Sequence, residues 1–131
     1  MSIAFSLARR LPLVIRDGWK TDFDAYRGIE LSGKKAGIIG LGRIGTRIAE
    51  MTQAFGMETL YWSRSTRDER FAYLELEDLI RESDVIFYTL AKNDETLYIL
   101  APDLLANLKK TVLFISIAHI DHALFVSLAE E

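Results

Sequence analysis

The sequence contains no cysteine, no excess of positive charge and no long hydrophobic run. The absence of cysteine excludes disulfide bonds, thiolate nucleophiles and cysteine-ligated zinc, and it is typical of a cytoplasmic protein. The formal net charge is -3, so the chain has no overall basic field to attract nucleic acid or an anionic membrane. We therefore expect neither nucleic acid nor a membrane among its partners.

Membrane-spanning and targeting signals are also missing. No apolar run approaches the roughly 20 residues that cross a bilayer. The opening MSIAFSLARR has an apolar stretch too short for a signal peptide, and its arginines follow that stretch instead of preceding it. With 131 residues, half of them hydrophobic, the chain has the length and composition of one globular domain. We expect a cytoplasmic location.

The amino-terminal segment is expected to be a helix followed by a linker. Ile3, Leu7 and Leu11 recur at helical spacing and Pro12 follows, which predicts a helix over 2–11 that ends at the proline. Because this helix begins at the start of the sequence, we expect the chain to be part of a longer protein. The predicted division is a helix and linker over 1–34 and a partial nucleotide-binding domain over 35–131.

The remaining residues alternate between strand and helix patterns. Buried strands are predicted at 36–40, 58–62, 85–90 and 111–117. Helices are predicted at 43–55, 76–82, 94–99, 102–108 and from about 122 to the end. Such alternation is typical of a parallel sheet with helices on both faces. The predicted fold class is α/β, a Rossmann-type doubly wound parallel sheet that is incomplete, with about four strands.

The first long helix has a clear apolar stripe and a clear stop signal. Ile44, Ile48, Met51 and Phe55 fall four, three and four residues apart, which is one face of an amphipathic helix. Gly56 follows at the position where a glycine commonly ends a helix.

Between the first strand and this helix lie three glycines with the spacing of a dinucleotide-binding turn. Gly40 would make the tight turn, Gly42 would let the backbone approach a pyrophosphate, and Gly45 would allow close packing of helix and strand. The helix that begins near Arg43 offers unpaired N–H groups, including that of Ile44, to an anion. The alternative is that the glycines serve packing alone.

The end of the second strand bears on the choice of cofactor. Sites that prefer NAD usually have a carboxylate there, whereas this chain has Ser63, Arg64 and Ser65. A carboxylate about 4 Å from a 2′-phosphate would cost about 4 kcal/mol at an effective dielectric of 20. Ser63 avoids that repulsion, and Arg64, with Arg67 as a second candidate, could bind the phosphate. NADP is the expected cofactor and NAD is possible; alternatively, both arginines are solvated loop residues.

Several of these segments together resemble a known family. LSGKKAGIIGLGRIGTRIAEMTQAFGM, SRS, LEDLIRESDVIFYTL, the pair Glu95-Thr96 and LLANLKKTVLFIS are similar to the cofactor-binding domain of the D-isomer-specific 2-hydroxyacid dehydrogenases, which include glyoxylate/hydroxypyruvate reductases. The resemblance covers nearly all of the chain but less than half of a family member. It implies hydride transfer between a nicotinamide and a small 2-keto or 2-hydroxy acid, with an arginine on the substrate carboxylate and a histidine–glutamate pair on the proton.

The resemblance breaks at the catalytic residues. His119 stands where the family has its arginine, and a histidine lacks the planar fork that clamps a carboxylate. The family's glutamate and histidine would lie beyond Glu131. The family's His-Leu-Pro, which lines the nicotinamide side, corresponds to Thr89-Leu90-Ala91, so Leu90 is the expected cofactor contact there. The chain by itself is expected to be inactive.

His119 and His122, with Asp121 between them, could suggest a metal site. Two histidines and one aspartate make an incomplete and badly directed ligand set, so no metal is expected. A proton-transfer role for either histidine, or a role in a loop or helix cap, stays open.

Two classes of function remain open. The chain is part of an oxidoreductase acting on 2-hydroxy or 2-keto acids, or it is a non-catalytic relative that binds a dinucleotide and regulates or scaffolds. In either case the strand over 111–117 would be an open apolar sheet edge, and such edges recruit partners. We therefore expect the isolated chain to form a homodimer or to aggregate through this strand, or the missing part of the protein to cover the strand.

Overall fold

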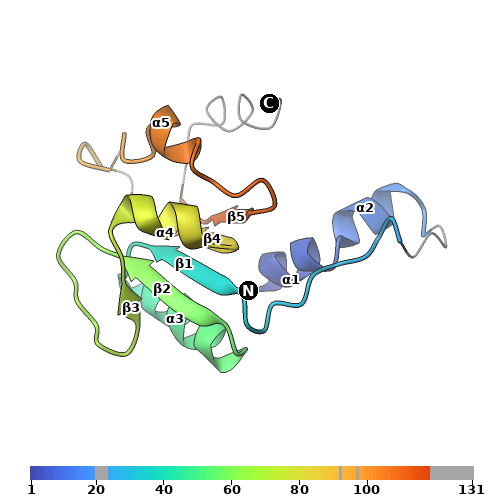
Figure 1. The fold of residues 1–131 in the computed structure, drawn as a ribbon, viewed down its shortest axis with the longest axis horizontal. Coiled ribbons are helices and arrows are strands. Elements are labelled where there is room, and N and C mark those ends of the chain that lie inside the picture. The colour runs from blue at the N-terminus through green and yellow to red at the C-terminus, as the bar shows by residue number, and fades with distance from the viewer. Residues whose placement is uncertain (20–23, 92, 97, 119–131) are drawn as a thin grey trace.

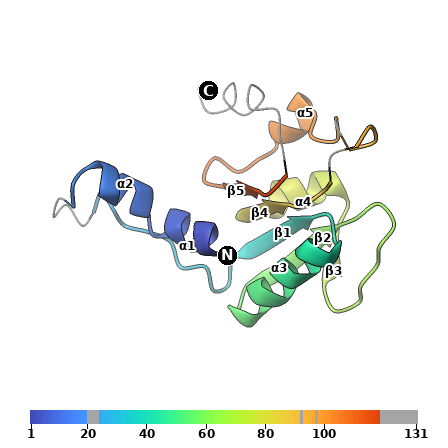
Figure 2. The ribbon, with the colours of Figure 1, turned by 180° about the vertical axis from the view of Figure 1, so that it is seen from behind.

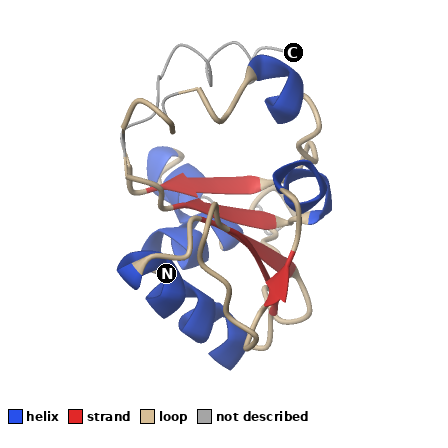
Figure 3. Ribbon diagram, turned by 90° about the vertical axis from the view of Figure 1, so that its left-hand side faces the viewer, coloured by secondary structure: helices blue, strands red, loops and turns tan. Residues whose placement is uncertain are grey.

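The computed structural model describes residues 1–19, 24–91, 93–96 and 98–118. Its centre is one parallel sheet in the order β3-β2-β1-β4-β5, seen along its length in Figure 3. The strands are β1 (Lys35–Ile39), β2 (Glu58–Trp62), β3 (Ala72–Tyr73), β4 (Val85–Tyr88) and β5 (Leu113–Ser116). The expected parallel Rossmann-type sheet is confirmed.

Helices lie on both faces of the sheet (Figures 1 and 2). The helices are α1 (Ser2–Ala8), α2 (Leu11–Arg16), α3 (Arg43–Ala54), α4 (Leu76–Glu82) and α5 (Pro102–Leu105). Of these, α2 projects away from the sheet (Figures 1 and 2) and has no buried residue. Side chains of α1 and α3 join one buried cluster and those of α4 and α5 join the other. Within the described ranges, no helix is long and apolar enough to cross a membrane.

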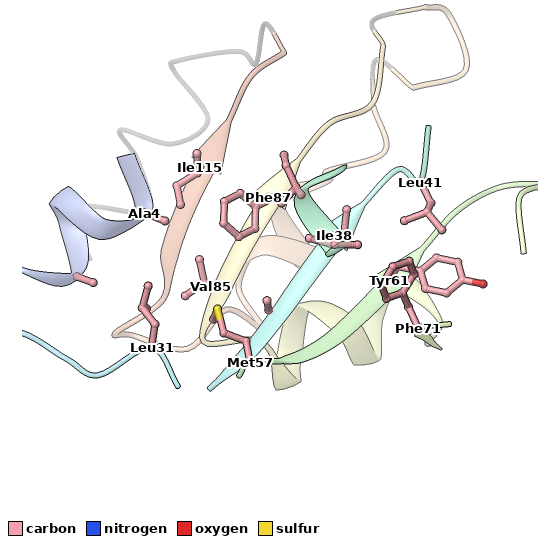
Figure 4. Close-up of a cluster of buried hydrophobic side chains, with 14 residues drawn as sticks. Ala4, Leu31, Ile38, Leu41, Met57, Tyr61, Phe71, Val85, Phe87 and Ile115 are labelled. Carbon is pink, nitrogen blue, oxygen red and sulfur yellow. The ribbon is translucent and has the colours of Figure 1, made fainter. Parts of the chain in front are cut away.

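The sheet forms the core because its register aligns apolar side chains across all five strands. Tyr73, Tyr61, Ile38, Phe87 and Ile115 are neighbours in one row. All but Tyr73 are buried, and the four appear in the cluster of Figure 4 with Ala4 from α1. Because side chains alternate along a strand, the residues next to this row face α4 and α5 instead.

The number of strands, and the limits of two of them, differ from the sequence-based prediction. The sheet has five strands where about four were predicted. The additional strand, β3, was missed because it is only two residues long, too short to show an alternating pattern. The strands predicted at 85–90 and 111–117 are also shorter, ending at Tyr88 and spanning Leu113–Ser116.

The region around Pro12 was also predicted wrongly. The first helix ends at Ala8, Arg10 has a left-handed φ of 53°, and a second helix begins at Leu11 with Pro12 in its first turn. Proline is tolerated there because the first N–H groups of a helix have no acceptor within it. Pro12 therefore lies in the first turn of a helix, in the segment predicted to be a linker.

Of the short helices expected after β4, only part is present. Residues 93–96 form a turn, and the helix predicted at 102–108 is limited to Pro102–Leu105. The last predicted helix, from about residue 122, lies outside the described residues.

The face of α3 that packs on the sheet is not the predicted stripe. Ile48 is buried, but Ile44, Met51 and Phe55 are 55%, 39% and 47% exposed. The buried face instead carries Gly45, Ile48, Ala49 and Thr52. Small side chains allow the helix to lie close to the strands, which hydrophobicity alone does not reveal. The predicted stop at Gly56 is confirmed by its positive φ of 75°.

A polar network joins the amino ends of the central strands. The Asp84 carboxylate accepts hydrogen bonds from the Lys35 N–H at 2.9 Å and from the Lys109 ammonium at 2.8 Å. Partial burial by itself raises the pKa of Asp84, but these two donors outweigh it and hold the pKa below its ordinary value. Lys35 also pairs with Glu82 at 2.6 Å, which lowers the pKa of that carboxyl. The network thus connects β1, the end of α4 and the segment before β5 to the start of β4.

Replacing Asp84 with alanine should lower the free energy of unfolding by about 1 kcal/mol, since it removes two hydrogen bonds to a charged group and Lys109 is partly screened by solvent. The stability from this group is present above its ordinary pKa and is lost as the pH falls toward the lower folded pKa. The difference between wild type and Asp84→Ala should therefore shrink below about pH 4. Urea unfolding at several pH values measures it.

Asp24→Ala is the matched control, because Asp24 forms an exposed ion pair with Arg27. Its effect should stay within about 0.5 kcal/mol. Equal losses for the two variants would contradict a structural role for the network.

Candidate functional site

The turn between β1 and α3 lies at the carboxyl edge of the sheet and is held from both sides. Gly40 has a φ of 98°, a conformation that residues other than glycine rarely adopt. Its N–H donates to the Trp62 carbonyl at 2.9 Å, and its carbonyl accepts the Thr89 hydroxyl at 2.6 Å. The turn is thus fixed between the ends of β2 and β4.

The other two glycines of the motif have different surroundings. A Cβ at Gly45 would overlap the Gly40 carbonyl and lie 2.9 Å from the Thr89 hydroxyl oxygen, whereas a Cβ at Gly42 would meet nothing within 4 Å. Gly45 is therefore needed for close packing of α3 on the sheet. Gly42, which precedes the helix in an extended conformation, leaves open space beside the backbone.

The first turn of α3 presents free N–H groups to that space. The first intrahelical bond here is donated by Thr46 to the Gly42 carbonyl at 2.9 Å, so the amides of Arg43, Ile44 and Gly45 have no acceptor within the helix. The turn contains no acidic residue, and the side chains of Arg43 and Ile44 are exposed. Together with the helix dipole, this arrangement favours an anion at the helix end.

A second turn, at the end of β2, contains the residues expected to contact the adenosine ribose. The Ser63 side chain is buried, and its hydroxyl accepts the N–H of Thr66 at 3.2 Å. Arg67 donates to the carbonyls of Ser63 and Thr66 at 2.9 and 3.0 Å. Its guanidinium also lies 3.9 Å from the centre of the Tyr73 ring. Arg67, considered a second phosphate ligand, is therefore engaged in holding this turn.

Tyr73 supports that arrangement. Partial burial, together with its hydrogen bond to Glu75 at 3.2 Å, raises the pKa of the Tyr73 phenol. Arg67 stacks on this ring as a cation on an aromatic face.

Arg64 and Ser65 are exposed in the same turn. Arg64 forms an ion pair with Glu95, which belongs to the turn after β4. The sequence placed Glu95 only within a family motif; no pattern indicated that it would reach across the carboxyl edge of the sheet to Arg64.

The remaining predicted site residues have different outcomes. Leu90 follows β4, and its side chain lies against the backbone of Gly40, so a Cβ there would approach it to 2.7 Å. His119, expected at the position of the family's arginine, lies outside the described residues, as do Asp121 and His122. Among the residues that the structure does describe, no group of histidine, aspartate and glutamate could hold a metal ion.

Comparison with known proteins is decisive for the family. A model described as the NAD-binding domain of D-isomer specific 2-hydroxyacid dehydrogenases matches residues 1–123. The chain belongs to this family. It corresponds to the nicotinamide dinucleotide-binding domain of that family.

Relatives of this dehydrogenase domain are known from archaea and bacteria. It is 41% identical over 107 residues to a glyoxylate reductase of Aeropyrum pernix, which covers 78% of this chain and 31% of that relative. It is 36% identical over 127 residues to glyoxylate/hydroxypyruvate reductase B of Serratia proteamaculans, covering 88% and 39%. The chain thus spans about a third of the length of these relatives.

Two solved enzyme structures share the fold across 97–98% of this chain. A D-lactate dehydrogenase of Aquifex aeolicus, in complex with NAD and lactic acid, has a TM-score of 0.88 at 25% identity and is covered to 42%. An acyclic imino acid reductase in complex with NADPH and D-arginine has a TM-score of 0.87 at 25% identity and is covered to 44%. The two neighbours carry different nicotinamide cofactors, so the fold does not decide between NAD and NADP.

The two neighbouring glycines give a direct test of the turn geometry. Gly45→Ala should lower the free energy of unfolding by about 2 kcal/mol or more, because its methyl group would force α3 away from the Gly40 carbonyl. Gly42→Ala should change it by less than about 1 kcal/mol, since the methyl group enters open space. Urea unfolding of both variants checks the difference; equal losses would contradict the described packing.

Proposed function

We propose that this domain binds NADP through the turn at the carboxyl end of β1, as part of an oxidoreductase that transfers hydride to or from a 2-hydroxy or 2-keto acid. The observation that carries the proposal is the combination of free amides at the start of α3 with open space beside Gly42. In this proposal the pyrophosphate binds at Gly40, Gly42, Arg43, Ile44 and Gly45.

The preference for NADP is proposed from the turn after β2. Ser63 and Arg64 provide no negative charge where the 2′-phosphate would lie, and Arg64 and Ser65 are exposed to receive it. Leu90 is proposed to line the nicotinamide side of the site, since it lies over Gly40 where the strands end. NAD remains the alternative cofactor.

The proposed substrate is a small 2-keto or 2-hydroxy acid, acted on by the full-length protein. Support comes from the relatives, which are named glyoxylate and hydroxypyruvate reductases. We propose that the isolated chain is inactive, because the family's catalytic arginine is replaced by His119 and no counterpart of its glutamate and histidine falls within the sequence.

A non-catalytic role is the second candidate, favoured by the same replacement at His119. Such a protein would bind the dinucleotide and regulate or scaffold another process. Oxidation of NADPH by the full-length gene product in the presence of glyoxylate or hydroxypyruvate distinguishes the two candidates. Cofactor binding without turnover of either acid would favour the non-catalytic role.

We also propose that the protein is a homodimer. Among the described residues β5 is the last strand of the sheet, and a strand at the edge of a sheet can accept a partner strand. Sedimentation equilibrium of the full-length gene product tests this, because a monomer at every concentration would contradict it.

Titration of the full-length gene product with NADPH and NADH, followed by nicotinamide fluorescence, tests the binding site. Ser63→Asp should raise the Kd of NADPH about tenfold to a hundredfold by repelling the 2′-phosphate, and should raise that of NADH much less. Gly42→Ala should weaken both cofactors about tenfold or more, because its methyl group occupies the space proposed for the pyrophosphate.

Thermal unfolding of the two variants is the control for intact structure. If Gly42→Ala leaves the affinity for both cofactors unchanged, the proposed pyrophosphate site is wrong. If Ser63→Asp leaves the ratio of NADPH to NADH affinity unchanged, only the proposed preference for NADP is wrong.

A further inference from the structure

The ion pair between Arg64 and Glu95 joins two turns that are distant in the sequence. Arg64 lies directly after β2, and Glu95 lies in the turn over 93–96 that follows β4. In the sheet order these strands flank β1 on either side. The pair therefore reaches across the carboxyl edge of the sheet, on the side where β1 leads into the glycine turn.

The turn that carries Glu95 is firmly held. The Asn93 side-chain oxygen accepts the N–H groups of Glu95 and Thr96, both at 3.0 Å. The Thr96 hydroxyl donates to the Ala91 carbonyl at 2.6 Å and accepts the Asn93 N–H at 2.9 Å, and Thr96 is buried. These bonds restrain the backbone at Glu95, while its side chain is 71% exposed and extends to Arg64.

The turn that carries Arg64 is held independently of the ion pair. The Ser63 hydroxyl and the Arg67 guanidinium bond to groups within that turn, and Arg67 also stacks on Tyr73. Arg67 is thus turned toward its own backbone. Arg64 instead has a side-chain carboxylate as its partner and is 45% exposed, so an arriving anion can reach its guanidinium.

We propose that Glu95 is a specificity-determining residue that competes with the 2′-phosphate of NADPH for Arg64. This inference rests on the proposed cofactor site. A guanidinium binds carboxylate and phosphate through the same planar N–H groups. For Arg64 to bind the phosphate, its bond to Glu95 must loosen, and the nearby carboxylate repels the arriving anion.

NADH carries an uncharged hydroxyl in place of the phosphate and has no need to displace Glu95. The ion pair between Arg64 and Glu95 can stay intact while NADH binds. Glu95 therefore lowers the affinity for NADPH but not that for NADH. The ratio of the two affinities is then smaller than it would be if Arg64 had no carboxylate partner.

The test is the Kd of NADPH and of NADH for the full-length gene product carrying Glu95→Gln. An exposed ion pair has a modest strength, so we expect NADPH to bind about two to five times more tightly, with NADH changed by less than about 1.5-fold. The gain for NADPH should diminish as the salt concentration rises, because both competing interactions are screened.

Two further variants separate this competition from general charge effects. Asp94→Asn removes one negative charge from an exposed residue of the same turn, and it should change the ratio of the two affinities less than Glu95→Gln does. In an Arg64→Gln background, Glu95→Gln should lose at least half of its gain for NADPH.

The outcomes of the proposals are distinguishable. If neither nicotinamide cofactor binds the wild-type protein, the proposed function fails and the inference with it. If both bind but Glu95→Gln leaves their affinity ratio unchanged, or Asp94→Asn has an equal effect, only the inference is overturned. A gain fully retained in the Arg64→Gln background would likewise overturn it, since competition for Arg64 would then not be the cause.

Discussion

The close approach of α3 to the carboxyl end of β1 is the constraint on which the rest of the structure depends. The Gly40 carbonyl lies so near Gly45 that no side chain fits between them, and the Thr89 hydroxyl holds the same carbonyl from β4. This contact joins the helix to two strands of the sheet at once. It also aims the free amides of the helix end along the edge where the strands stop.

The remaining packing is arranged around that contact. The side of α3 facing the sheet is made of small residues, so the helix lies close to the strands and buries Ile48 without a wide apolar stripe. The larger apolar residues of α3 then point elsewhere. Phe55, the residue that caps α3, packs edge-to-face on Phe5 of α1 with ring centres 4.9 Å apart, and so links the amino-terminal helix to the domain.

The carboxyl edge of the sheet combines rigid and exchangeable elements. Thr89, Asn93 and Thr96 fix backbone positions through short hydrogen bonds, and Arg67 fixes the turn after β2. The exposed Arg64–Glu95 pair lies between these anchored turns and is the contact that a charged ligand could replace. In the proposed competition, Arg64 would change its partner while the backbone of both turns stays in place.

Much of this could be predicted from the sequence, because the deciding interactions are local. The parallel sheet, the glycine turn, the exact limits of β2 and α4 and the stop at Gly56 follow from alternation of strand and helix patterns and from backbone preferences of single residues. The short strand β3, the helix that begins at Leu11 and the buried face of α3 did not follow. Each depends on neighbours distant in the chain or on backbone geometry that apolar spacing does not encode.

The sequence by itself thus determined the family, the order of the elements and the position of the glycine turn. Only the tertiary structure decided that Arg67 bonds within its own turn and that Arg64 pairs with the carboxylate of Glu95. Arg64 and Arg67 are three residues apart and chemically identical, and Glu95 is some distance further along the chain. Their different roles arise because folding brings the ends of β2 and β4 to the same edge, where contacts in space replace proximity in sequence.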